Sequence, residues 1–178
     1  MKKVFLFILI AVFTASMGYT QTVNKVTRGT VTFKIKNLGI NTGGSLGGVQ
    51  ATVQFNPDQL ASSSIEATVD AATINTDNEQ RDEHLKSDAF FDIQRYPKIT
   101  MRSVSFKKKS GNSFTGKFNL TLKGKTRQVD IPFTYTDSGS AISLTGTFKL
   151  NRLDYGLGGN SLVLSDEATV TIQVELAK

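Results

Sequence analysis

The side chains best suited to acid–base chemistry lie in one short polar segment. His84 is the only histidine of the chain, and Asp82, Glu83 and Asp88 lie near it in sequence. An imidazole beside carboxylates can act as a general base or join them around a metal. One histidine and no cysteine exclude a multi-histidine or thiolate metal site. An enzyme that uses His84, Asp82 and Tyr155 therefore stays an alternative to a histidine that packs on a helix surface or at the rim of a barrel.

Two arginines lie beside further polar residues. Arg81 precedes Asp82, and the two side chains can pair to fix their segment or can meet the polar group of a ligand. Arg152 lies near Asp154 and Tyr155 in a glycine-rich loop. There Tyr155 can contact a headgroup, or the loop can be held by its own polar contacts. The residues themselves leave these interpretations open.

The first twenty residues have the pattern of an export signal. Lys2 and Lys3 precede an apolar run from Val4 to Phe13, which is too short to span a bilayer. We therefore expect residues 1–20 to be removed and the mature protein to be periplasmic or secreted. Without cysteine there is no acceptor for a lipid anchor, so the expected product is not an integral membrane protein.

The expected mature chain, residues 21–178, is one domain that is long enough to bury a core. Its formal charge falls from +6 to +4 once Lys2 and Lys3 are removed, and the excess is spread along the chain. This charge does not favour a nucleic-acid partner. The residues predict no cofactor, and they leave the oligomeric state open, a dimer included.

Period-two alternation of apolar and polar residues is the strongest signal, and it predicts an all-β fold of eight antiparallel strands. A phase shift between Met101 and Val104 also predicts a β-bulge. The residues expected to face inward are Val31, Phe33 and Ile35; Val49, Ala51, Val53 and Phe55; Ile65, Ala67, Val69 and Ala71; members of 98–106; Phe114, Gly116, Phe118, Leu120 and Leu122; Val129, Ile131, Phe133 and Tyr135; Ile142, Leu144, Gly146, Phe148 and Leu150; and Val170, Ile172, Val174 and Leu176.

Eight such strands can close into a barrel, and a two-sheet sandwich is the alternative. The connectors 37–48, 72–97 and 151–166 are long and alternate with short turns. In an up-and-down meander, connectors of the same parity emerge at the same end. The three long connectors are therefore predicted to share one rim, as in small barrels that hold one ligand.

One short helix is expected, in the long connector between the third and fourth strands. It is predicted over residues 77–85, with Thr76 and Glu79 forming a capping box. Phe90 and Phe91 follow it and are expected to face the barrel interior as a lid, because two adjacent aromatic rings need an apolar environment.

On these segments the chain resembles the YceI-like family, a group of exported, lipocalin-like bacterial proteins that bind polyisoprenoids. The most specific match is the pattern T-x-N-E-x-R-D-x-H-L, F-F-D and Y-P-x-I within residues 63–99. Supporting segments are VTFKIKNLGI (31–40), GKFNLTLKGKTRQVDIPF (116–133) and LNRLDYGLG (150–158). The chain departs from the family at two places. Asn37 stands where relatives often have a histidine before Leu-Gly, and the region of Leu46 lacks an aromatic residue that is common there.

The resemblance implies an exported lipid-binding protein, not an enzyme, whose barrel carries or sequesters a long isoprenoid such as a quinone-like or prenyl lipid. The inward residues include very small side chains among the large ones, which leaves room for such a chain. The alternative is a barrel with a filled core that binds a protein or a glycan. The residues expected at the apolar pocket and its mouth are Phe33, Ile35, Leu38, Val53, Phe55, Val69, Phe90, Phe91, Met101, Phe118, Leu120, Phe133, Phe148 and Tyr155.

Overall fold

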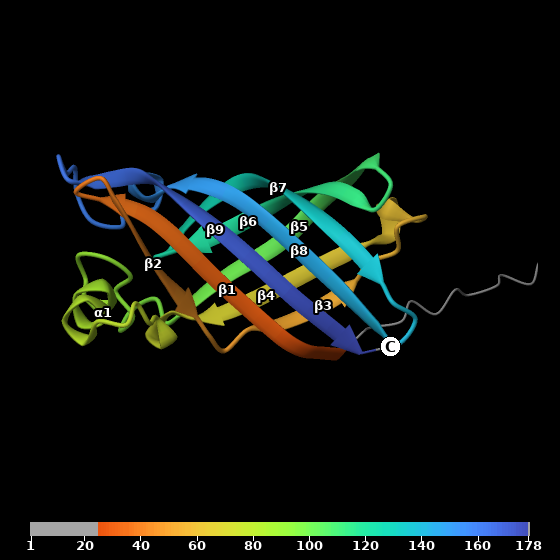
Figure 1. Ribbon diagram of the computed structural model, residues 1–178, viewed down its shortest axis with the longest axis horizontal. Helices are drawn as coiled ribbons and strands as arrows, with labels where there is room; N and C mark the ends of the chain where they lie inside the picture. Colours follow the sequence, from red (N-terminus) through yellow and green to blue (C-terminus); the bar gives the residue numbers. More distant parts are fainter. Residues whose placement is uncertain (1–24, 178) are drawn as a thin grey trace, which may run out of the picture.

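A computed structural model describes residues 25–177 of the chain, so the expected export signal lies outside the described residues. Nine strands form one antiparallel sheet that curls around a central axis (Figure 1), in the order β2-β1-β9-β8-β7-β6-β5-β4-β3. The strands are β1 (Lys25–Asn37), β2 (Ile40–Leu46), β3 (Gln50–Gln54), β4 (Ser64–Asp70), β5 (Lys98–Ser110), β6 (Ser113–Leu122), β7 (Lys125–Asp137), β8 (Ala141–Asn151) and β9 (Leu164–Ala177).

The predicted all-β antiparallel fold with one short helix is confirmed, and the sheet has nine strands where eight were expected. The additional strand is β2, which lies inside the segment 37–48 that was taken for a connector. β2 pairs with β1, whereas β3 pairs with β4 at the opposite edge of the sheet. Gly47 and Gly48 separate them, and Gly48 has φ +64°, a conformation that favours glycine. β2 and β3 are thus two parts of one interrupted segment, and each part forms one edge of the sheet.

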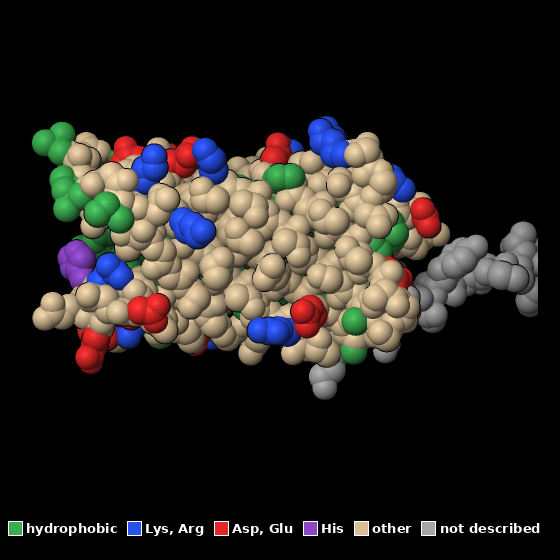
Figure 2. Space-filling view, viewed as in Figure 1, with side chains coloured by type: hydrophobic (Ala, Val, Ile, Leu, Met, Phe, Trp, Pro, Cys, Tyr) green, Lys and Arg blue, Asp and Glu red, His purple; other side chains and the backbone are tan. Residues whose placement is uncertain are grey.

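The curling brings β1 close to β3 at the far edge, but no backbone ladder joins these two strands within residues 25–177, so the hydrogen-bonded sheet is not closed. A Cβ placed on Gly29 of β1 would lie 2.6 Å from the Cβ of Val49, next to β3. Bulges accommodate the curvature, and a register shift between Ser103 and Ser105 confirms the predicted bulge in β5. On the face seen in Figure 2, basic and acidic side chains are interspersed over the outer surface.

Aromatic rings close one end of the barrel. The ring of Phe55 meets those of Phe106, Phe114 and Phe133 edge-on, with centroids 5.2, 5.1 and 5.3 Å away. Phe118 joins through Phe106, at 5.8 Å. We call these five residues the aromatic floor. Edge-to-face contacts of this kind add to the free energy gained by burial.

The opposite end, which we call the mouth, gathers the long connectors. The amide of Leu38 donates to the carbonyl of Val163 at 2.8 Å, and the amide of Gly158 donates to the carbonyl of Ala89 at 2.8 Å. Ser45 and Asn75 exchange backbone hydrogen bonds of 2.8 and 3.0 Å. The prediction that the three long segments share one rim is therefore confirmed (Figure 1, left end).

The only α-helix of the described part, α1 (Glu79–Lys86), lies beside the mouth and begins two residues later than expected. The predicted capping box is wrong: Asn78 is the N-cap, and its side chain accepts from the amide of Arg81 at 2.9 Å. The Thr76 side chain cannot take this role, because its hydroxyl instead donates to Asp82. Within residues 25–177, no helix has the length and apolar character that crossing a membrane requires.

Candidate functional site

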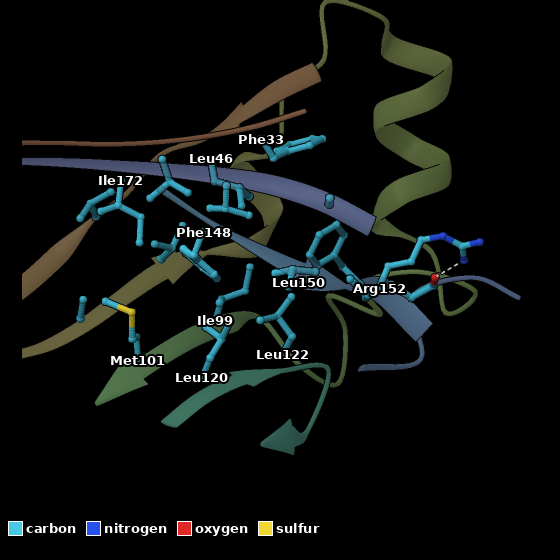
Figure 3. Close-up of a pocket in the computed structure, with 18 of the residues that line it drawn as sticks. Phe33, Leu46, Ile99, Met101, Leu120, Leu122, Phe148, Leu150, Arg152 and Ile172 are labelled. Atoms are coloured by element: carbon cyan, nitrogen blue, oxygen red, sulfur yellow. Dashed lines mark hydrogen bonds between the residues drawn. The ribbon is translucent and has the colours of Figure 1, made fainter. Parts of the chain in front are cut away.

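A cavity of about 510 Å³ lies inside the barrel between the mouth and the aromatic floor. Its wall is built from inward-facing aliphatic and aromatic side chains, and Figure 3 shows several of them pointing toward the same space. Residues labelled there are Phe33, Leu46, Ile99, Met101, Leu120, Leu122, Phe148, Leu150, Arg152 and Ile172. Phe118 and Phe133 line the cavity and also belong to the floor, so the floor forms its inner end.

Most of the residues expected at a pocket line this cavity. They share an inward direction because side chains two apart on a strand point to the same face. The expected residues on its wall are Phe33, Ile35, Val53, Val69, Phe90, Phe91, Met101, Phe118, Leu120, Phe133 and Phe148. Phe90 and Phe91 follow α1 and face inward at the mouth, as predicted. That these side chains bind a ligand stays a prediction.

Three of the expected residues do not line the cavity. Leu38 lies in the turn after β1 and is 71% exposed, because the alternation of β1 ends before it. Phe55 is buried in the aromatic floor, beyond the inner end of the cavity. Tyr155 is 1% exposed and ends a short 3₁₀ segment (Arg152–Tyr155) that packs into the core. Alternation predicts which face a side chain takes, but not its depth along the barrel axis.

Several wall residues were not singled out. Ile99, Leu122, Leu150, Val170 and Ile172 line the cavity, and all of them follow the alternation that predicts the inward face, although none was expected at the pocket. Leu46 also lines it but lies in the glycine-rich β2, where no alternation is visible.

The small inward residues have two different roles. Gly146 lines the cavity, but a Cβ there would lie 3.0 Å from the Ile131 side chain and 3.2 Å from the Pro132 carbonyl oxygen, so it leaves little space. Ala51 and Ala67 line the cavity and leave space, as the sequence suggested. Gly116 does not, because a Cβ there would lie 2.4 Å from the Phe118 ring and 3.1 Å from the Phe106 ring. The space at Gly116 is therefore filled by the floor.

Polar groups on the cavity wall gather at the mouth. Apart from Thr100 on β5, the polar side chains that line the described cavity belong to the ends of β1 and β2, the α1 segment and the loop after β8. They are Asn37, Thr42, Thr76, Arg81, His84 and Arg152. The cavity thus has an apolar body and a polar entrance, which suits a molecule with an apolar chain and a polar end.

Arg81 and Asp82 are linked through Thr76 and do not form a direct ion pair. Arg81 Nε donates to Thr76 Oγ1 at 2.8 Å, and Nη2 donates to the Thr76 carbonyl at 2.6 Å. The Thr76 hydroxyl in turn donates to Asp82 Oδ1 at 2.5 Å. Among residues 25–177 no carboxylate forms an ion pair with Arg81, which leaves its Nη1 hydrogens available at the cavity entrance.

Arg152 has the opposite environment and holds the loop between β8 and β9. It is 3% exposed, and its guanidinium donates to the carbonyls of Leu157, Gly159, Leu164 and Ser165 and to the Asp166 carboxylate. These five bonds use all five guanidinium hydrogens. Arg152 is therefore a structural residue at the mouth. Of the two interpretations left open for this loop, headgroup contact or its own polar contacts, the second accounts for how the loop is held.

The residues of the enzyme alternative have separate partners. His84 is exposed at the mouth, and its ring lies edge-on to Phe90 with centroids 5.0 Å apart. Asp82 accepts from the amide and the hydroxyl of Thr76. In the described part of the chain, neither of them hydrogen-bonds to Tyr155, and no group of three or more His, Cys, Asp or Glu side chains is placed to hold a metal.

The hydroxyl of Tyr155 is buried. Within residues 25–177 it has no hydrogen-bond partner. Burial raises the pKa of Tyr155 above its ordinary value of 10.0; the charge of Asp154 also raises it, and that of Arg127 opposes the shift. Tyr155 therefore stays neutral and serves the packing of the loop.

Comparisons with known proteins agree with this architecture. A family model described as a YceI-like domain matches residues 22–176. A UPF0312 protein of Vibrio cholerae is 25% identical over 134 residues, which cover 71% of each chain.

Solved structures share the fold. BcnA of Burkholderia cenocepacia superposes with a TM-score of 0.79 at 23% identity, covering 83% of this chain and 95% of BcnA. A polyisoprenoid binding domain from Saccharophagus degradans, implicated in plant cell wall breakdown, superposes with a TM-score of 0.66 at 14% identity, covering 87% of this chain and 97% of that domain. At these identities the likeness shows the fold alone.

Proposed function

This chain belongs to the YceI-like family, and we propose that it binds an isoprenoid lipid, with the apolar chain inside the barrel and the polar end at the mouth. The observation that carries the proposal is a cavity of about 510 Å³, walled by hydrocarbon side chains and closed at one end by aromatic rings. Each Å² of apolar ligand surface that enters it gains about 25 cal/mol. A hydrocarbon chain therefore needs no charged partner to bind.

The cavity volume suggests how much of the chain is enclosed. An apolar protein cavity of about 150 Å³ holds one benzene, or roughly 25 Å³ per carbon atom, so 510 Å³ corresponds to about twenty carbons. A longer lipid would extend past the mouth, because Phe118 and Phe133 close the inner end.

The wall shape favours a branched chain. Ala51 and Ala67, which pair across β3 and β4, are small positions on a wall whose neighbouring side chains, such as Val53 and Met101, are larger. The methyl branches of an isoprenoid can fill such places, whereas a straight acyl chain would leave them empty and lose contacts there. The shared fold with a polyisoprenoid binding domain supports the same ligand class.

Arg81 is the group that would meet the polar end of the lipid. Its Nε and one Nη2 hydrogen are held by Thr76, which fixes the guanidinium at the entrance with Nη1 available. A hydroxyl, a quinone carbonyl or a phosphate can each accept from it. We further propose that the protein is exported and carries or sequesters its lipid in the periplasm or outside the cell, as the leader-like residues 1–20 suggest.

Mass spectrometry of an organic-solvent extract tests the proposal. The purified protein should release an isoprenoid, or take up a prenyl alcohol of about twenty carbons when it is offered. Ala51→Phe should block uptake, because Ala51 lines the cavity. Thr52→Phe, the matched control on the exposed face of the same strand, should not. An empty extract together with no uptake would overturn the proposal.

The filled-core alternative is less well supported. It predicts that Phe33, Phe118 and Phe148 touch across the barrel axis. Instead, all three line the cavity, and in the described part of the chain no ring contact joins any two of them.

A further inference from the structure

Exposed apolar side chains form part of the mouth. Leu38 and Ile40 are each 71% exposed, Val163 is 48% exposed, and Leu162 is fully exposed. They come from the turn between β1 and β2 and from the loop before β9, which are joined by the hydrogen bond from the Leu38 amide to the Val163 carbonyl, 2.8 Å long. Figure 2 shows hydrophobic side chains gathered at this end of the molecule. We call these four residues the apolar rim.

Folding does not account for the apolar rim. Leu38 has φ +52° in a tight turn followed by Gly39 at φ +77°, a geometry that asparagine and glycine favour. A leucine in this conformation costs about 1 kcal/mol or more, and its exposed side chain contributes little packing in return. An unfavourable residue that adds no stability points to a role outside the fold.

The rim continues directly into the cavity wall. Asn37 and Leu164, the chain neighbours of Leu38 and Val163, both line the cavity. A surface that covers the rim would therefore lie against the entrance of the cavity. Exposed apolar groups at the entrance of an apolar cavity suit contact with a source of apolar ligand.

The charges beside the rim indicate what covers it. Lys34 and Lys36 lie on the outer face of β1, exposed, within four residues of Leu38, and neither has an ion pair among residues 25–177. Lysines beside exposed leucines are typical of surfaces that rest on a bilayer, where ammonium groups meet lipid phosphates and apolar side chains enter below them.

We propose that the apolar rim docks the mouth onto the surface of a phospholipid bilayer, with Leu38, Ile40, Leu162 and Val163 entering the interfacial region. Two narrow adjoining loop tips fit between lipid headgroups, but they are a small area for a stable protein interface, which needs about 800 Å² on each partner. This docking goes beyond ligand binding, because it does not depend on which molecule occupies the cavity.

Vesicle flotation tests the proposal. The protein is mixed with vesicles of phosphatidylcholine alone or with added phosphatidylglycerol, and the bound fraction gives a partition coefficient. Replacing the rim by Leu38→Ser, Ile40→Ser, Leu162→Ser and Val163→Ser should lower that coefficient by on the order of tenfold or more. Val104→Ser, at a 50% exposed valine on the outer face of β5, is the matched control and should leave it unchanged.

The lysines provide a second readout. Lys34→Gln with Lys36→Gln should weaken binding by about fivefold per lysine on phosphatidylglycerol vesicles, with little change on phosphatidylcholine alone. No flotation of the wild type, or equal flotation of the rim variant at unchanged thermal stability, would overturn the proposal. So would a dimer of the wild type that the rim variant dissociates, because the rim would then be a protein interface. Vesicles free of isoprenoid keep the result separate from the test of lipid uptake.

Discussion

The two ends of this barrel are held together by different interactions. At the closed end, short turns join β5 to β6 and β7 to β8, and five phenylalanine rings pack against one another. At the mouth, long segments are tied by polar contacts, above all the five hydrogen bonds of Arg152 and the contacts around Thr76. Apolar packing stabilises the sheet at one end, and the polar network leaves the other end able to present an entrance.

The largest expected effect comes from removing a ring of the aromatic floor. Phe114 is 1% exposed, so Phe114→Ala should lower the free energy of unfolding by about 3–5 kcal/mol. Phe33→Ala, at the half-buried wall of the mouth, should lower it by roughly half as much or less, because less area leaves water there on folding. Urea denaturation measures both. Equal losses would mean that the two ends contribute alike.

The second comparison is between the two arginines of the mouth. Arg152→Met should lower the free energy of unfolding by about 3 kcal/mol, because four carbonyls and Asp166 lose their donor. Arg81→Met should lower it by about 1 kcal/mol or less, since only Thr76 loses a donor. Arg152→Lys should recover only part of the loss, because an ammonium has three donors. Similar destabilisation by the two methionine variants would contradict this division of roles.

The third comparison concerns lipid retention and tests the mouth as the way in. Phe90→Asp with Phe91→Asp should weaken retention by on the order of tenfold or more, because a carboxylate on the cavity wall is desolvated when the tail is enclosed. Lys107→Asp with Lys109→Asp, on exposed positions near the turn after β5 at the closed end, should leave retention unchanged. Lys108 is spared because its ammonium lies 5.8 Å from the centroid of the Phe114 ring. Equal losses at both ends would exclude a single entrance.

Alternation was sufficient to predict most of the sheet and the inward face, and the lengths and parity of the connectors predicted the shared rim. It missed β2 because Asn41, Thr42, Gly43, Gly44 and Ser45 carry no apolar period. That segment is a strand because β1 pairs with it from Asn37–Ile40 to Val31–Leu46. A glycine at 44 is needed there, since a Cβ would lie 2.8 Å from the Phe33 ring and 2.6 Å from the Asn75 carbonyl oxygen. These are contacts between distant segments, which no local pattern contains.

The site was predictable in direction but not in depth. Phe33 and Phe55 both follow an inward phase, yet one lines the cavity and the other lies in the floor. The roles of Arg81 and Arg152 also could not be separated, because both precede acidic or aromatic neighbours in sequence. Their difference arises from which carbonyls the folded loops bring to each guanidinium.

The smallest expected effect concerns Tyr155, which lies at the mouth but is buried like the side chains of the closed end. Its buried hydroxyl has a pKa above the ordinary value, chiefly because of burial, and then because of Asp154. Above pH 10 the unfolded chain therefore releases a proton that the folded chain retains, so unfolding becomes more favourable as pH rises. The contribution of Tyr155 to stability is complete below that pH and is lost as pH rises toward the folded-state pKa.

Tyr155→Phe should flatten this alkaline decline. At neutral pH it should change the free energy of unfolding by no more than about 1 kcal/mol, since the hydroxyl has no partner among residues 25–177. Asp154→Asn should reduce the decline in part, because the carboxylate is the second cause of the shift. Urea midpoints measured from pH 8 to pH 11 for the three proteins give the comparison, and identical slopes for wild type and Tyr155→Phe would show that Tyr155 is hydrated.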